Sequence, residues 1–269
     1  MTAAFPSGTY GTWETCETLS PHAQVVARYS FTSDRNLLQR AELLHKKSYY
    51  DKKQGWYNLA YETGLGALST RKRLLGPEHP DTLTSMDNLA DVLGSQGKYK
   101  AAEEMHRRAL ELREKVLGPE HPDTLISMDN LADVLGSQGK YETAEEMHQR
   151  ALKLCEKILG HEHPDTLISM NNLADVLGDQ GKYETAEEIH RRALELREKV
   201  LGPEHPDTLT SMNNLASVLG SQGKYEAAEE MHQRVLELRE KVLGPEHPDT
   251  LTSMNNLADV LRSQGKCEA

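Results

Sequence analysis

Apolar residues recur along the chain with the spacing of an amphipathic helix, in two runs within every 42 residues. In one such unit, the first run follows Pro80 and stops before Gly97. Its apolar positions are Leu83, Met86, Leu89, Ala90 and Leu93. Because residues three and four apart share one face of a helix, this spacing predicts a helix with a single apolar stripe. Proline suits the first turn of such a helix, and glycine supplies the left-handed residue that ends it.

The second run of the unit begins after Lys98-Tyr99 and stops at Gly118-Pro119. Its apolar positions, which again predict a helix, are Ala102, Met105, Ala109, Leu112 and Val116. Only a very short turn separates the two predicted helices, so they must pack as an antiparallel hairpin.

This hairpin is repeated almost without change. Residues 75–83 return at 42-residue intervals, and the only substitution within them is His161 in place of proline. The copies begin at Leu117, Leu159, Leu201 and Leu243. Self-similarity of this period is the signature of a repeat architecture. One hairpin has too few large apolar side chains to offset the entropy of ordering it, so each hairpin must stack on its neighbours.

The two ends of the chain are less regular. Residues 36–74 form a degenerate repeat in the same register, and residues 75–269 form the tandem array. Residues 1–35 are expected to cap the first hairpin. Within them, residues 10–30 indicate one or two short helices, with Ser20-Pro21 as either a helix start or a kink.

We expect the last repeat of the array to be truncated, because its second helix should start where the sequence ends at Cys267-Glu268-Ala269. The final first helix, at about residues 248–263, would then lack its hairpin partner. Part of its apolar stripe should face water, and we expect self-association through this C-terminal end.

Composition narrows the range of partners. The formal net charge of −11 disfavours nucleic acid and anionic membranes, since both need a basic footprint. Residues 1–20 lack the apolar core of a secretory signal, and no stretch approaches a membrane span. The three cysteines, Cys16, Cys155 and Cys267, show no paired spacing, which fits a reducing compartment. We therefore expect a cytoplasmic protein with neither a nucleic-acid nor a membrane partner.

The small and apolar positions of the hairpin resemble the tetratricopeptide repeat signature. The matching residues are Leu89, Ala90, Gly97, Tyr99, Ala102 and Ala109. The 42-residue period, the Asn-Asn-Leu-Ala run and the linker 75–83 resemble the kinesin-light-chain type of this repeat, and even more closely the repeat arrays of fungal NOD-like receptors. The resemblance covers about residues 36–269. It implies an all-α, right-handed superhelical solenoid of antiparallel helix hairpins.

Two features depart from the family pattern. The proline that usually ends a repeat, expected near Glu114, is absent. The bulky residue that the family places late in the second helix is histidine here, at His106, His148, His190 and His232.

A polar stripe runs from Thr84 through Asp87 to Ser95, opposite the apolar face of the first helix, and asparagine recurs in it. Asparagine is a poor helix former, so its place in the middle of every first helix needs a reason. The resemblance implies that this position faces a concave groove, where an amide can pair with a peptide backbone. The alternative is that each asparagine hydrogen-bonds the next hairpin and only spaces the array. The predicted peptide-groove residues are Asn88, Asp91, Asn130, Asp133, Asn172, Asp175, Asn214 and Asn256.

The charged residues of this predicted groove are aspartates, so we expect a basic peptide rather than the acidic cargo that kinesin light chains favour. Each repeat also has a linker histidine such as His79 and a helical histidine such as His106. Copies 42 residues apart on successive hairpins cannot bring three ligands to one metal ion. We expect the linker histidines to hold the loop and the helical ones to pack. With no nucleophile–base pair either, we expect no metal, no cofactor and no enzymatic activity.

The favoured function is a non-enzymatic scaffold that binds a peptide or a partner helix in its groove, as the sensor or regulatory array of a NOD-like receptor would. Two alternatives stay open. One is a kinesin-light-chain-like cargo adaptor, although residues 1–35 contain none of that family's coiled-coil heptads. The other is a truncated product of repeat expansion without a specific partner.

Overall fold

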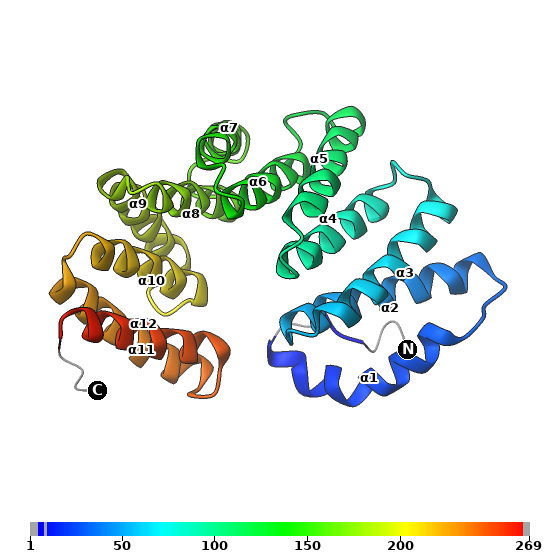
Figure 1. Cartoon of the computed structure of the whole chain (residues 1–269), viewed down its shortest axis with the longest axis horizontal. Helices are drawn as coiled ribbons and strands as arrows, with labels where there is room; N and C mark the ends of the chain where they lie inside the picture. Colours follow the sequence, from blue (N-terminus) through cyan, green and yellow to red (C-terminus); the bar gives the residue numbers. More distant parts are fainter. Residues whose placement is uncertain (1–4, 8–9, 266–269) are drawn as a thin grey trace. The chain divides into compact units, whose positions relative to one another are not determined.

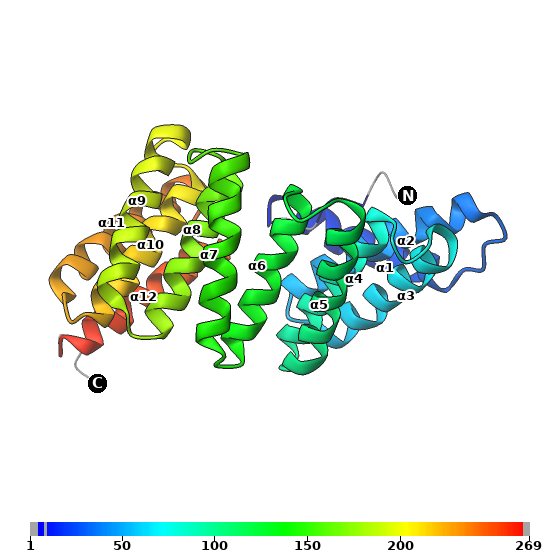
Figure 2. The ribbon, with the colours of Figure 1, turned by 90° about the horizontal axis from the view of Figure 1, so that it is seen from above.

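The computed structural model describes residues 5–7 and 10–265, and every regular element in that part of the chain is helical (Figures 1 and 2). A short 3-10 helix, η1 (Tyr10–Thr12), precedes twelve α-helices. The predicted all-α repeat fold is therefore confirmed. None of the described helices is long and apolar enough to cross a lipid bilayer.

The chain divides into two compact units, residues 1–138 and residues 139–269. Unit 1 contains α1 (Trp13–Arg28), α2 (Asp34–Lys53), α3 (Tyr57–Leu75), α4 (Pro80–Ser95), α5 (Tyr99–Val116) and α6 (Pro122–Ser137). Unit 2 contains α7 (Tyr141–Ile158), α8 (Pro164–Asp179), α9 (Tyr183–Leu201), α10 (Pro206–Ser221), α11 (Tyr225–Leu243) and α12 (Pro248–Ser263). Within each unit, helices that follow one another in sequence pack against each other. The first helices of successive repeats also touch, as α8 does α10.

The first helix of each 42-residue repeat begins at a His-Pro-Asp sequence. In α4, Nδ1 of His79 accepts a hydrogen bond from the backbone N–H of Asp81 at 3.2 Å, and Pro80 occupies the first turn. The hydroxyl of Thr82 donates to the carbonyl of Gly76 at 2.9 Å and fixes the preceding loop. The same histidine bond recurs at His121, His163, His205 and His247. The linker histidines hold the loop, as predicted.

The turn between the two helices of a hairpin depends on one glycine. Gly97 has a φ of 73°, a conformation in which a side chain would be strained. Its N–H donates to the carbonyl of Gly94 at 2.8 Å, and the N–H of Lys98 donates to the carbonyl of Leu93 at 2.9 Å. These bonds satisfy carbonyls at the end of α4, and α5 starts at Tyr99. The chain therefore reverses direction within a few residues.

Small residues lie where the helices approach most closely. In unit 1, Ala90 and Ala102 have no exposed surface, and the same is true of Ala186 and Ala193 on α9 in unit 2. Larger side chains pack around these contacts. One buried cluster connects α10, α11 and α12 through Leu215, Leu219, Ala228 and Val260. The core of each unit therefore continues from one hairpin to the next, and no hairpin has a separate core.

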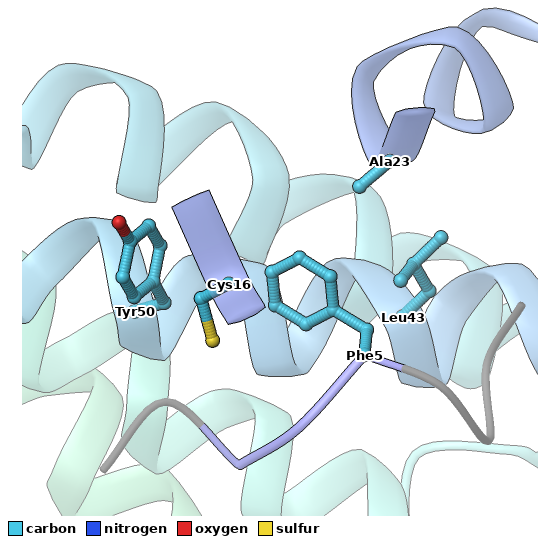
Figure 3. Close-up of a cluster of buried hydrophobic side chains, with 5 residues drawn as sticks. All are labelled: Phe5, Cys16, Ala23, Leu43 and Tyr50. Carbon is cyan, nitrogen blue, oxygen red and sulfur yellow. The ribbon is translucent and has the colours of Figure 1, made fainter. Parts of the chain in front are cut away.

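At the N-terminal end, α1 packs on α2 (Figure 1). Between them lies a buried cluster of Phe5, Cys16, Ala23, Leu43 and Tyr50 (Figure 3). The ring centroids of Phe5 and Tyr50 are 6.4 Å apart in an edge-to-face arrangement. This cluster covers the outer side of α2, which is consistent with the expected capping role of residues 1–35.

The sequence left open whether Ser20-Pro21 starts a second helix, and the structure shows that it does not. A single helix, α1, continues through Pro21. Proline removes one helical hydrogen bond, but here it is exposed, so the carbonyl it leaves free can bind water.

At the C-terminal end, α12 leaves part of its apolar stripe exposed. Leu251 is 48% and Met254 is 36% exposed, whereas the equivalent residues of α10, Leu209 and Met212, are almost fully buried. In α10 these residues belong to a cluster that includes Val235 of α11. Residues 266–269, where the sequence predicts the interruption of the last repeat, lie outside the described residues. Self-association through this face stays a prediction.

The alanine contacts generate a prediction about packing. Ala186→Leu places extra volume at a fully buried helix contact and should lower the free energy of unfolding by roughly 1–3 kcal/mol. Glu188→Gln on the same helix is the control, because Glu188 is exposed. Chemical denaturation measures both, and equal midpoints for the two variants would show that Ala186 does not lie at a close contact.

Candidate functional site

Three pockets in the described part of the chain have the same kind of polar lining. Pocket A, in unit 1, has a volume of about 390 Å³ and lies between α4, α5 and α6, with one residue from α2. Pocket B, of about 460 Å³, lies between α8, α9 and α10, and pocket C, of about 360 Å³, lies between α10, α11 and α12. Pockets B and C share Ser217 and Ser221, so within unit 2 they adjoin.

The pockets have equivalent linings because each is built from the same positions of two successive repeats. The lining of pocket A is Lys52, Asp91, Gly94, Tyr99, Asn130, Asp133, Val134 and Ser137. The lining of pocket B is Asp175, Gly178, Asp179, Tyr183, Asn214, Ser217, Val218 and Ser221. The lining of pocket C is Ser217, Gly220, Ser221, Tyr225, His232, Asn256, Asp259, Val260 and Ser263. Residues three, four and seven apart on one helix share a face, which is why they recur together.

Six of the eight predicted groove residues line these pockets. They are Asp91, Asn130 and Asp133 in pocket A, Asp175 and Asn214 in pocket B, and Asn256 in pocket C. Asn172 is half-buried on α8 and lines none of the three.

Asn88 and Asp87 do not lie on the polar surface that the sequence stripe indicates, because both are buried. The amide of Asn88 donates to Oγ of Ser48 on α2 at 3.1 Å. For Asn88, the structure therefore favours the alternative role of joining hairpins. We leave this residue out of the candidate site.

Two of the pocket asparagines also link successive repeats. Nδ2 of Asn214 lies 3.3 Å from Oδ1 and 3.4 Å from Oδ2 of Asp175. Nδ2 of Asn256 donates to Oδ1 of Asn213 at 2.9 Å. In both residues the amide N–H₂ serves the array, while the carbonyl oxygen is the group left for a ligand.

The charges of pockets A and B differ. In pocket A, the ammonium group of Lys52 lies 2.9 Å from Oδ2 of Asp91, so the chain supplies its own cation. Pocket B includes Asp179, whose equivalent in the repeat of pocket A is Ser95, a residue that does not line pocket A. None of the residues that line pocket B is basic. Burial, and then the neighbouring charge of Asp175, raise the pKa of Asp179. Pocket B therefore holds two carboxylates that repel each other.

Each pocket has a buried histidine behind it, contributed by the second helix of a repeat. Nδ1 of His106 is 3.2 Å from Oδ1 of Asp87, and Nε2 is 3.3 Å from Oδ1 of Asp91. Burial disfavours the charged ring, but the hydrogen bonds to these two carboxylates outweigh it and raise the pKa of His106 to about 9. Asp87 is also bound by Arg113. His106 is thus a charged member of a buried ion cluster.

In pocket B the equivalent histidine has one amide neighbour. In the orientation that satisfies all its neighbours, the Asn171 amide donates to Nδ1 of His190 at 3.2 Å, and its oxygen accepts from Nη1 of Arg197 at 2.8 Å. This leaves the ring proton on Nε2, which lies 3.3 Å from Oδ1 of Asp175.

His232 is the equivalent residue in pocket C, and it has no carboxylate in either place. Asn213 stands where unit 1 has Asp87, and Ser217 stands where unit 1 has Asp91. Burial, and then the charge of Arg239, lower the pKa of His232 to about 4. Its Nδ1 is buried without a hydrogen-bond partner.

Sequence reasoning missed the tyrosines that line the pockets. Tyr99, Tyr183 and Tyr225 each start a second helix, where the hairpin turn brings them beside the first helix. The recurrence of a tyrosine directly after the hairpin turn was the available signal in the sequence. The helical histidines do pack, as predicted, but their hydrogen bonds join the core to the pocket floor, and repeat spacing alone does not indicate that.

Comparisons with known proteins agree with this architecture. A family model described as tetratricopeptide repeat matches residues 39–115, 92–157, 130–199, 165–241 and 213–269. The chain belongs to the tetratricopeptide repeat family. No curated protein sequence matches it.

Several solved tetratricopeptide-like structures resemble the chain. A protein of Podosopora anserina described as a kinesin light chain with nearly identical TPR-like repeats is 27% identical, covers 75% of this chain and 96% of its own, and has a TM-score of 0.60. BtubC (BKLC) from P. vanneervenii is 21% identical, with 86% and 92% covered and a TM-score of 0.65. The apo form of RapI is 16% identical, with 98% and 97% covered and a TM-score of 0.61. The last two likenesses establish the fold alone.

The two extreme histidines of this tetratricopeptide array should respond to pH in opposite directions. The pKa of His106 is raised from 6.5 to about 9, so its stabilisation of unit 1 is complete below pH 6.5 and is lost as the pH rises through 9. The pKa of His232 is lowered from 6.5 to about 4, so unit 2 loses stability as the pH falls from 6.5 towards 4.

Ring resonances of the histidines, followed by NMR between pH 4 and pH 10, test this prediction, with His106→Gln and His232→Gln providing the assignments. His106 should titrate near 9, and His232 should stay neutral down to about 4. Titration of both rings near 6.5 would contradict the assigned environments.

Proposed function

We propose that the chain is a non-enzymatic scaffold that binds an extended peptide carrying basic side chains, with pocket B as the main cation subsite. The observation that carries this proposal is the pair of carboxylates, Asp175 and Asp179, in pocket B, whose lining contains no lysine or arginine. Two carboxylates on adjacent turns of one helix repel, and a ligand cation between them would relieve that repulsion.

Pocket A supports the choice of a cation. There the ammonium group of Lys52 lies within 2.9 Å of Asp91, the residue equivalent to Asp175. The chain thus contains an example of a lysine seated at this position of the repeat. Pocket B has the same carboxylate, a second one beside it, and no lysine of its own among its lining residues.

The remaining groups of pocket B suit a peptide backbone. The carbonyl oxygen of Asn214 can accept a backbone N–H, because the amide N–H₂ already faces Asp175. Tyr183 adds a partly exposed ring at the mouth, which suits aliphatic parts of a lysine or arginine side chain.

An acidic cargo peptide, which resemblance to kinesin light chains would imply, fits these pockets poorly. Their linings contain five aspartates, and Lys52 is the one lysine or arginine among them. The narrower role of a sensor array in a receptor rests on the resemblance to fungal NOD-like receptors.

Removal of one pocket carboxylate should weaken a basic ligand. Asp179→Ser installs the residue found at Ser95, Ser137 and Ser221, so the variant should fold normally. Fluorescence anisotropy with a labelled peptide of alternating lysine and glycine should show about two- to fivefold weaker binding, since an exposed ion pair contributes up to about 1 kcal/mol. Added salt should weaken binding to the wild type.

Glu184→Gln is the matched control, because it also removes one negative charge from α9 in unit 2 but lies outside pocket B. Its affinity for the lysine peptide should equal that of the wild type. Equal losses in the two variants would mean that only net charge matters, and preference for a glutamate–glycine peptide would overturn the proposal.

A further inference from the structure

Pocket C differs from pockets A and B in the residue that separates the pocket from the buried histidine. In pockets A and B, Asp91 and Asp175 line the pocket and bind the histidine behind them, and the histidine itself is not part of the lining. Pocket C has the shorter Ser217 at this position, and His232 lines it. His232 is only 1% exposed, so it forms the floor of the pocket.

The hydroxyl groups around pocket C have committed their protons to the backbone. Ser217 donates to the carbonyl of Asn213, Ser221 donates to that of Ser217, and Ser263 donates to that of Asp259. The distances are 3.1, 3.1 and 2.9 Å, respectively. Each hydroxyl oxygen therefore offers only lone pairs to a ligand.

The larger polar groups of the pocket add further acceptors. One N–H of the Asn256 amide donates to Oδ1 of Asn213, so the residue keeps its carbonyl oxygen and its second N–H. Asp259 brings a carboxylate, of which Oδ1 is held by Arg262 at 2.6 Å and Oδ2 is available. The lining contains no lysine or arginine.

The floor of the pocket is a neutral imidazole. The groups that face His232 are Asn213 and Ser217 from α10, Tyr225 and Arg239 from α11, and Asn256 and Asp259 from α12. Arg239 does not supply a donor to the pocket, because it donates to the carbonyl of Asp249 and to the hydroxyl of Ser253, both at 2.8 Å. Nδ1 of His232 is enclosed, and the equivalent nitrogens of His106 and His190 face Asp87 and Asn171, so Nε2 is the ring nitrogen on the pocket side.

We propose that pocket C is an arginine subsite, in which the guanidinium group of a partner peptide is bound by Asp259, the carbonyl oxygen of Asn256 and the serine oxygens, above the ring of His232. Guanidinium presents five N–H donors in a plane and accepts none, which matches these acceptors. A lysine ammonium group has three donors and is more strongly hydrated, so it fits less well. A carboxylate ligand would be repelled by Asp259. The inference rests on the proposed function, since it adds a second, selective subsite beside pocket B.

The test uses the full chain with isotope-labelled histidine and follows the His232 ring by NMR at pH 7. N-acetyl-arginine amide is the probe, and it should shift this ring saturably while leaving the His106 and His190 rings unmoved. N-acetyl-citrulline amide has the same shape without the charge and should bind about tenfold more weakly, because charge-assisted hydrogen bonds are about twice as strong as neutral ones. N-acetyl-glutamate amide should cause no shift.

Ser217→Asp restores the carboxylate that covers the histidine in the other pockets, so it should fold and should close pocket C. The arginine probe should then lose at least about tenfold in affinity. Ser95→Asp, an identical substitution at an exposed position of unit 1, should leave the binding unchanged. Because Ser217 also lines pocket B, the separate test of pocket B is the Asp179→Ser variant, in which the lining of pocket C is intact and the arginine probe should bind as to the wild type.

A shift of His232 by the glutamate probe and not by arginine would overturn the proposal, because the pocket would then take a carboxylate in place of the missing aspartate. Arginine binding that Ser217→Asp leaves unchanged would overturn it as well. If arginine binds at His232 but the lysine–glycine peptide binds nowhere, the proposed function of pocket B fails while the arginine subsite stands.

Discussion

The contact between successive hairpins is the constraint on which the rest of each unit depends. A single hairpin leaves half of its apolar stripe uncovered, and only a neighbouring hairpin, approaching across fully buried alanines such as Ala102 and Ala186, can cover it. The pockets are a consequence of this stacking. They form where the first helices of two repeats diverge at the surface, so their linings recur whenever the repeat does. Fold and candidate site thus have one physical cause.

The buried polar residues show how nearly identical repeats acquire different chemistry. Each repeat places a histidine behind its pocket, but the neighbours change from Asp87 in unit 1 to Asn171 and Asn213 in unit 2. Exchange of an acid for an amide preserves the shape while it changes which nitrogen of the ring carries a proton. The pKa of His106 is about 9 and that of His232 is about 4 although both rings are fully buried. Near-identity of repeats therefore does not imply that their pockets are equivalent.

The sequence was sufficient to predict the hairpins, the role of the linker histidines in holding the loop, and most of the pocket residues, because periodicity determines which residues share a helix face. The sequence was insufficient where the burial or contacts of a residue depend on the neighbouring hairpin. Asn88 and Asn130 occupy the same position of their repeats, but Asn88 is buried against Ser48 of the degenerate first hairpin, whereas Asn130 lines a pocket. The ion pair of Lys52 with Asp91 likewise joins residues from two different hairpins, one of them irregular. His232 lines its pocket because the short side chain of Ser217 does not cover it. The sequence alone does not indicate this, since the two residues belong to different helices.

The central claim is that the pockets of this tetratricopeptide array select basic side chains. A positional-scanning peptide library bound to the full chain tests it most directly, because the library presents every side chain without a prior choice of partner. We expect enrichment of lysine and arginine over all other residues, and the enrichment should disappear at high salt because the carboxylates of the pockets face solvent. Enrichment of aspartate or glutamate, or of aromatic residues regardless of salt, would contradict the claim.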